Sequence, residues 1–168
     1  HSTSTADAVK AYVQSLLASK CATWVQVPRE LWPSTWKGKY SKPMVLLVKS
    51  LYGHPEAGAH WEKHLEKIIS AMEGEPIPEF PSSYFFPKTK LLLTVYVDDF
   101  TLSAPTEHHS AFWRRLRQDV ELEAETGLER ILGRFHEELT LENRNYLAFN
   151  IGEYAQQACE LYTAVSGG

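Results

Sequence analysis

The fold that the sequence predicts depends on one segment, Leu91-Leu92-Leu93-Thr94-Val95-Tyr96-Val97-Asp98-Asp99-Phe100-Thr101-Leu102-Ser103-Ala104. Its two apolar runs, 91–97 and 100–104, are separated by only two residues, which is the spacing of a β-hairpin. Both intervening residues, Asp98 and Asp99, are acidic, and adjacent carboxylates repel each other. A divalent cation would offset that repulsion, and carboxylate oxygens suit Mg²⁺. The alternative is an ordinary turn, where aspartate is favoured for backbone reasons.

Other elements flank this hairpin. Apolar residues at helical spacing predict helices, which we expect over 7–18, 55–72, 106–120 and 152–164. Extended segments are expected at 22–27, 83–86 and 44–49 (the last as a buried strand), with a second hairpin formed by 131–139 and 146–149.

The order of these elements predicts an α+β fold. An element around Asp7, the helix 55–72, the hairpin 91–104, the helix 106–120 and a strand at 131–139 give the ferredoxin-like order β-α-β-β-α-β. In that fold the helices cover one face of an antiparallel sheet. Many unrelated functions use it, so the order alone decides nothing about chemistry.

Composition narrows the class of protein. The chain has 168 residues, of which 43% are apolar and 12% aromatic, enough for one domain spanning 1–168 with a core of its own. Its two cysteines, Cys21 and Cys159, do not form a CxxC pair, which favours a reducing compartment, either cytoplasmic or nuclear. No apolar run is long enough to cross a bilayer, so we expect no membrane partner. The net charge of −4 argues against an autonomous nucleic-acid binder.

Several short motifs occur in a particular order along the chain. Tyr96-Val97-Asp98-Asp99 matches the central motif of reverse transcriptases, and Asp7-Ala8-Val9-Lys10-Ala11-Tyr12 matches the Asp-x-x-x-Ala-aromatic motif that supplies their first aspartate. Ser50-Leu51-Tyr52-Gly53, followed by Ala57 and Trp61, resembles the copia-type signature Ser-Leu-Tyr-Gly-Leu-Lys-Gln-Ala-Pro-Arg-x-Trp. Ile131-Leu132-Gly133 is similar to the Phe-Leu-Gly-Ile segment of that family.

Each motif alone is weak, whereas the ordered set is specific. The chain therefore resembles the palm region of copia-type LTR retrotransposon reverse transcriptases. The resemblance implies an RNA-directed DNA polymerase that uses two Mg²⁺ ions, or Mn²⁺, for nucleotidyl transfer. It implies that Asp7, Asp98 and Asp99 are the catalytic metal ligands. Because adjacent strand residues point to opposite faces, we expect Asp98 to be a principal ligand beside Asp7, and Asp99 to support them.

The resemblance also implies nucleotide-binding residues. Tyr12 matches the aromatic steric gate that excludes a ribose 2′-hydroxyl, although its helical spacing fits a core residue equally well. Gly53 matches a glycine that lets the backbone approach the nucleotide and template, and an ordinary turn is the alternative. Ala57 and Trp61 are predicted to be core residues. Leu132-Gly133 is expected either in a primer-grip hairpin or in a bulged strand.

Partners follow from the same resemblance. They are an RNA or DNA template-primer, a deoxynucleoside triphosphate and the remainder of a Gag-Pol type polyprotein. The fingers that precede the palm in this family, and the thumb and RNase H that follow it, are not in the sequence, which would account for its acidic balance. The family's Lys, Gln, Pro and Arg are replaced in the copia-type signature, and this loss of positive charge should weaken phosphate binding. The replacing residues are Pro55, Glu56, Gly58 and Ala59.

Two other functions stay open at this point. A degenerate or domesticated copy would fold but not polymerise, and would serve as an interaction domain. A zinc hydrolase is the remote alternative, because His60 and His64 lie at i and i+4 of a predicted helix. The metalloprotease pattern, however, needs Glu directly after the first histidine, where Trp61 stands. The one basic cluster noted, Arg114, Arg115 and Arg117, is expected to be a solvated helix face.

Overall fold

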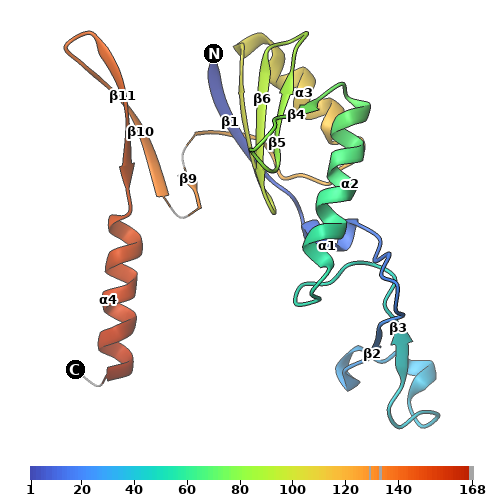
Figure 1. Ribbon diagram of the computed structural model, residues 1–168. Coiled ribbons are helices and arrows are strands. Elements are labelled where there is room, and N and C mark those ends of the chain that lie inside the picture. Colours follow the sequence, from blue (N-terminus) through green and yellow to red (C-terminus); the bar gives the residue numbers. More distant parts are fainter. Residues whose placement is uncertain (129, 133, 167–168) are drawn as a thin grey trace.

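The chain was described by a computed structural model that covers residues 1–128, 130–132 and 134–166 (Figure 1). The described residues form a mixed α+β structure with antiparallel sheets and four α-helices. No helix among them is both long enough and apolar enough to cross a membrane.

The largest sheet has six strands in the order β4-β5-β6-β7-β1-β8, and every neighbouring pair is antiparallel. In that order the strands are Glu75–Pro76, Ser83–Phe86, Leu91–Tyr96, Asp99–Ala104, Ser2–Asp7 and Thr126–Gly127. The predicted hairpin is confirmed as β6 and β7, but the turn expected at Asp98-Asp99 was wrong by one residue: Val97 and Asp98 form it, because Asp99 pairs with Tyr96 and belongs to β7. The strand expected at 83–86 is confirmed as β5.

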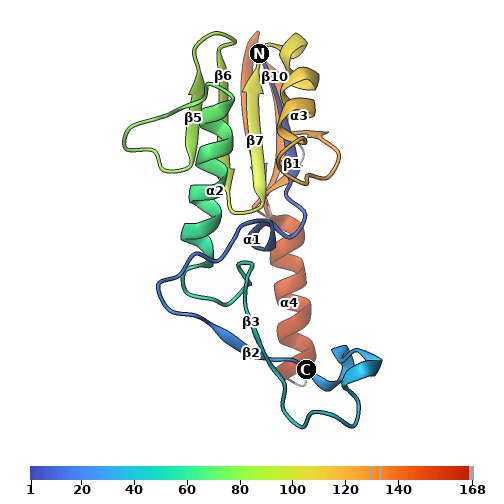
Figure 2. The same ribbon diagram turned by 90° about the vertical axis from the view of Figure 1, so that its right-hand side faces the viewer.

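One face of this sheet is buried beneath two helices (Figure 2). Residues alternate between buried and more exposed along both β6 and β7, as a sheet with one solvated face requires. The helices are α2 (Ala57–Ala71) and α3 (His109–Leu116), and their apolar faces pack against the sheet in a single core. The helices predicted over 55–72 and 106–120 are therefore confirmed, the second with a short 3₁₀ segment, η3 (Thr106–His108), before it.

A small polar network lies within this core. Trp113 on α3 is fully buried, and its indole Nε1 donates a hydrogen bond to the buried Ser4 hydroxyl of β1 over 2.9 Å. The same hydroxyl lies 2.6 Å from Nδ1 of His109. Because these polar atoms are satisfied by one another, a serine on β1 is tolerated in an otherwise apolar layer.

Two sequence predictions about this sheet were wrong. Residues 7–18 are not one helix: β1 ends at Asp7, and α1 is a single turn, Ala11–Gln14, which begins after Lys10 with φ of +52°. Asp7 belongs to the ladder with β7, and after α1 the chain is extended because Leu16 pairs with Lys49 and Leu17 N–H donates to the Val48 carbonyl. The strand expected at 131–139 does not join this sheet either, since the sixth position is filled by β8.

The later elements form a separate sheet. The second predicted hairpin is confirmed as β10 (Arg134–Leu141) and β11 (Arg144–Asn150), with β9 (Arg130–Ile131) beside β10. Its turn residues Glu142 and Asn143 both have positive φ, +48° and +62°, as a type I′ turn requires. The last predicted helix is confirmed as α4 (Gly152–Ser166).

A third pair of strands, β2 (Trp24–Gln26) and β3 (Met44–Leu46), confirms the extended segments expected at 22–27 and 44–49. The expectation that the second is buried was wrong, because Met44 is 51% exposed and Leu46 is 47% exposed. This hairpin extends beyond the N-terminal end of α2, away from the six-stranded sheet (Figures 1 and 2). Two 3₁₀ segments, η1 (Arg29–Leu31) and η2 (Ser34–Trp36), lie in its long loop.

The close approach of α2 to β5 leads to a prediction about Gly74. A Cβ atom at Gly74 would lie 2.5 Å from Ile69 Cγ2 and 2.8 Å from Phe86 Cζ, and both neighbours are buried in the core. We expect Gly74→Ala to lower the free energy of unfolding by about 1–3 kcal/mol, as overpacking does. Urea denaturation would measure the change.

Gly58→Ala is the matched control. A Cβ atom there meets only Tyr12 Oη at 3.8 Å, within α2, so the free energy should stay unchanged or rise by up to about 1 kcal/mol. Equal effects of the two substitutions would contradict the packing that the structure describes around Gly74.

Candidate functional site

Asp7 and Asp99 are brought together by the pairing of β1 with β7. The register places Asp7 directly opposite Asp99. The backbone N–H of Ala8 donates to the carbonyl of Asp98 over 2.8 Å, so Ala8 and Asp98 form a hydrogen-bonded pair. Because such pairs alternate, Asp7 and Asp99 form a non-hydrogen-bonded pair, the kind in which side chains are closer. Their Cβ atoms are therefore expected about 4.5–5.5 Å apart.

The three carboxylates influence one another electrostatically. Partial burial raises the pKa of Asp99, and the negative charges of Asp7 and then Asp98 raise it further. The ion pairs found within the described part of the chain all lie elsewhere and involve none of these three residues. A divalent cation would therefore meet uncompensated negative charge at this end of the sheet.

The side chains do not yet form a closed metal site. Within residues 1–128, 130–132 and 134–166, no three His, Cys, Asp or Glu side chains converge closely enough to hold a metal ion. A cation shared by Asp7, Asp98 and Asp99 would need the carboxylates to turn toward one another. The negative charge at the site therefore fits a cation, whereas the described side chains do not form a ready ligand set.

The turn that carries Asp98 is strained and supported. Val97 has φ of +57°, a conformation that is a genuine outlier for a β-branched residue. The indole Nε1 of Trp61 donates a hydrogen bond of 2.7 Å to the carbonyl of Val97. Trp61 and Ala57 are both buried on α2, which confirms that they are core residues. Trp61 also has a role that periodicity alone did not reveal, because it holds the turn between the two strands.

Two tyrosines stand beside these carboxylates. The rings of Tyr12 and Tyr52 are stacked at a tilt of 35°, with centroids 4.5 Å apart. Burial raises the pKa of Tyr52, and the charge of Asp98 raises it further, so Tyr52 lies within electrostatic reach of that carboxylate. Sequence reasoning missed Tyr52 as a site residue, although the Ser-Leu-Tyr-Gly motif already marked its position.

Tyr12 has features of both roles that the sequence left open, a core residue and a residue that lines a binding site. It packs against the core cluster, half-buried, and it also lines a cavity of about 190 Å³. The other lining residues come from α2 and from strands β5 and β6 with their adjoining turns, and they are Gly58, Trp61, Glu62, Leu65, Ser82, Tyr84, Val95 and Val97. A role for Tyr12 in excluding a ribose hydroxyl stays a prediction.

Gly53 lies in a turn next to this group. Its φ of +89° requires the left-handed region that glycine tolerates best, and the position where a Cβ would stand is open space. The turn is tied to α1 by buried serines that sequence reasoning did not single out: Ser15 Oγ and Ser50 Oγ lie 2.9 Å apart, and Ser50 N–H donates to the Ser15 carbonyl. Backbone approach to a nucleotide at Gly53 stays a prediction.

Other predicted positions are not brought to this place. Leu132 is exposed with φ of +49°, and Gly133 lies outside the described residues, so the primer-grip expectation is not tested. His64 has a pKa lowered by burial and by the charges of Lys49 and Lys67, while His60 Nε2 is 3.5 Å from a serine hydroxyl. Two lysines near a histidine disfavour a Zn²⁺ ion, and the described residues offer no third ligand.

Two of the three arginines in and after α3 pair with neighbouring acids, and Arg114 is exposed. Arg115 pairs with Asp119, and Arg117 pairs with Glu125 over 2.6 Å. These contacts agree with the solvated helix face that was expected.

Comparison of the chain with protein-family models finds no match, and comparison with curated proteins finds none either. The function must therefore be argued from the motifs and from the site itself.

The raised pKa of Asp99 leads to a prediction about stability. A carboxyl whose folded-state pKa exceeds its ordinary value of 3.8 binds more protons in the folded protein than in the unfolded protein. Its contribution to stability therefore falls as the pH rises from the ordinary pKa through the raised pKa of the folded state. Asp99→Asn removes the charge, and we expect it to raise the free energy of unfolding at pH 7 by about 0.2–1 kcal/mol. At pH 3.5 most of that gain should vanish.

Urea denaturation at both pH values measures this difference. Asp119→Asn is the matched control. Because Asp119 forms an ion pair with Arg115, this substitution should lower the free energy of unfolding at pH 7 and not raise it. An Asp99→Asn protein that is no more stable at pH 7 than the unmodified chain would contradict the repulsion inferred among the three carboxylates.

Proposed function

We propose that this chain is the palm core of an RNA-directed DNA polymerase of the copia retrotransposon type. The observation that carries the proposal is the meeting of motifs far apart in the sequence: Asp7 lies opposite Asp99, with Asp98 in the adjoining turn. Their separation in the chain makes a chance turn of two acids a poor explanation. The mutual effect on the pKa of Asp99 supports the same grouping.

The connectivity of the sheet supports a ferredoxin-like palm. Along the chain, β1, α2, β6, β7, α3 and β8 follow the order β-α-β-β-α-β. In space the four strands run β6-β7-β1-β8, with both helices on one face, and β4 and β5 extend the sheet beyond β6. On the other face Leu92 and Tyr96 of β6 are exposed, and a nucleic acid would approach that face at the end where the carboxylates meet.

The residues would act as follows. Asp7, Asp98 and Asp99 would hold Mg²⁺ or Mn²⁺, which when bound would stabilise the attacking and leaving oxygens of an in-line phosphoryl transfer. Trp61 would keep the Asp98 turn in place through its bond to Val97. Tyr12, supported by the Tyr52 ring, would bound the sugar of the incoming nucleotide. The partners would be template-primer, a deoxynucleoside triphosphate and the remainder of a polyprotein.

One observation favours a non-catalytic copy as the second candidate. Among the described residues, the cavity beside Tyr12 is lined by Glu62 and by no lysine or arginine, so a triphosphate there would meet no cation from them. Glu56, at a position where the family signature has glutamine, adds another negative charge near the same helix end. An interaction domain that descends from a polymerase would keep the carboxylates and lose the cations in this way.

A metal-binding experiment tests the proposed site. Because a cation would bind the folded chain and relieve repulsion, we expect Mn²⁺ to raise the melting temperature, and the rise should continue with the logarithm of its concentration above the dissociation constant. Asp7→Asn and Asp98→Asn should each abolish the rise, whereas Asp119→Asn should keep it. A rise of equal size in all four proteins would contradict metal binding at these carboxylates.

Primer extension then separates the two candidates. The assay uses Mg²⁺ or Mn²⁺, a homopolymer template and a protein in which the chain is extended at its N-terminus by the adjoining reading frame. We expect nucleotide incorporation, and Asp98→Asn should lower its rate by at least about 100-fold, as loss of an electrostatic stabiliser does. No incorporation by the unmodified protein would contradict the polymerase function and would favour the non-catalytic interaction domain.

A further inference from the structure

The long loop of the β2–β3 hairpin has a composition unlike the rest of the chain. We define the basic lobe as residues 27–43, which include η1 and η2. The wider segment 20–49 contains six lysines and arginines and only one acidic residue, Glu30, a net charge of +5. Since the whole chain carries −4, the remaining residues carry −9. Four of these six cations and Glu30 lie within the lobe itself, which gives it a net charge of +3.

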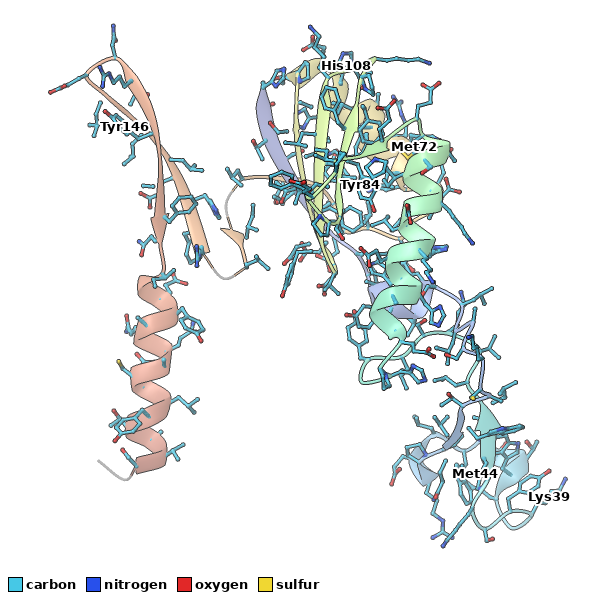
Figure 3. The ribbon with its side chains drawn as sticks, viewed as in Figure 1. Lys39, Met44, Met72, Tyr84, His108 and Tyr146 are labelled. Carbon is cyan, nitrogen blue, oxygen red and sulfur yellow. The ribbon has the colours of Figure 1, made fainter. Side chains whose placement is uncertain are left out.

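The charges of the basic lobe are available to a ligand. Arg29, Lys37, Lys39 and Lys42 are exposed, and none takes part in an ion pair with any described residue. Figure 3 shows Lys39 at the outer end of the lobe, far from the six-stranded sheet. Cations that have no acidic partner in the protein are suited to an external polyanion.

Aromatic rings alternate with these cations and are held in fixed positions. Trp32 Nε1 donates to the Val27 carbonyl over 2.8 Å, and the Arg29 guanidinium lies 5.7 Å from the Trp32 ring centroid. Trp36 and Tyr40 form an edge-to-face pair with centroids 5.8 Å apart, and Tyr40 is 55% exposed. The Tyr40 ring is thus braced on one side and open to solvent.

The backbone of the lobe is ordered by short-range bonds. Three prolines, Pro28, Pro33 and Pro43, restrict it, and Val27 N–H donates to the Pro43 carbonyl where the loop closes. Each 3₁₀ segment has its own hydrogen bond between residues i and i+3, such as Trp36 N–H to the Pro33 carbonyl. A loop fixed in this way loses little conformational entropy when it binds.

These residues enclose a concave surface. A cavity of about 730 Å³ is lined by both cations and aromatic rings of the lobe, and its lining residues are Arg29, Glu30, Trp32, Lys37, Gly38, Lys39, Tyr40 and Ser41. Gly38 has φ of +80° and leaves open space where a side chain would stand. The concavity has room for several planar groups and for the phosphates that join them.

We propose that the basic lobe binds single-stranded nucleic acid, with phosphates on its lysines and arginine and bases against Tyr40. Exposed ring faces beside cations are the combination that single strands require, whereas a duplex hides its base faces. An anionic membrane is a poorer fit, because the cations line the same concavity as the rings instead of forming a collar behind an apolar tip.

The position of the lobe suits it to hold the single-stranded part of a template. The carboxylate end of β1 and β7 leads into α1, and the lobe projects beyond that same end of the molecule (Figures 1 and 2). A template that crosses the open face of the sheet would continue as a single strand toward the lobe. This use rests on the proposed polymerase function, whereas the binding itself does not.

Fluorescence anisotropy of a labelled 15-nucleotide single strand, titrated with the 168-residue chain, tests the proposal. We expect Lys37→Glu with Lys39→Glu to weaken binding by about 10-fold or more and to reduce the salt dependence by about one unit of log-log slope. Tyr40→Leu keeps the apolar volume but removes the ring, and should weaken single-strand binding by about 5-fold or more with less effect on a duplex.

Matched controls separate the lobe from overall charge and from the carboxylates. Lys63→Glu with Lys67→Glu makes the same charge change on exposed positions of α2 and should alter affinity by less than about 2-fold. Asp119→Asn, outside both the lobe and the Asp7, Asp98 and Asp99 group, should bind the oligonucleotide within about 2-fold of the unmodified chain. Each variant is compared by thermal unfolding to establish that it is folded.

Three outcomes overturn the proposal: lobe and α2 variants that weaken binding equally, lobe variants that bind like the unmodified chain, and binding only to phosphatidylserine vesicles. Absence of polymerase activity with lobe-dependent binding intact would overturn the proposed function alone, so the two failures are distinguishable.

Discussion

The antiparallel register between β1 and β7 is the constraint on which both the core and the candidate site depend. It places Ala6 opposite Phe100 on the buried face and Asp7 opposite Asp99 on the open face. Because side chains alternate along a strand, a shift of one residue would turn Asp7 toward the helices and expose the core residues. Burial of the apolar face therefore holds the carboxylates together as a by-product of packing, without any attraction between them.

The site itself opposes folding. Asp99 has a raised pKa because it is partly buried near two other negative charges, and Val97 adopts a backbone conformation that a valine avoids. The surrounding structure offsets both effects: buried Trp61 bonds the Val97 carbonyl, and the ladder between β6 and β7 closes directly after the turn. Strain and repulsion that a fold retains at one place are typical of a functional site rather than of a structural turn.

The sequence predicted what short-range patterns encode. Alternation and the two-residue spacing identified β6 and β7, and helical spacing identified α2. It did not predict β1, because the Ser-Thr-Ser-Thr-Ala run at 2–6 has no apolar alternation, nor β8, whose two residues have no period to detect. The closeness of Tyr52 to Asp98 could not be derived either, since it depends on how α1 and the 50–53 turn pack. The resemblance implied that Asp7 and the two aspartates would meet, and the register of β1 supplies a physical basis for that meeting.

The net charge of −4 argues against an autonomous nucleic-acid binder, and that expectation stays a prediction. The structure shows, however, that the charge is unevenly distributed. The total is the sum over two unlike parts, +3 in the projecting hairpin of residues 24–46 and −7 in the remainder. Screening in salt limits the reach of each charge to about 8–10 Å, so an approaching strand responds to the local surface and not to the sum. The acidic remainder would then act as a repulsive surround that confines a polyanion to the lobe, while the carboxylates would approach phosphate only through a cation. Under that arrangement an acidic overall balance is compatible with a nucleic-acid enzyme, since the same negative charge that repels the backbone is what would recruit the metal.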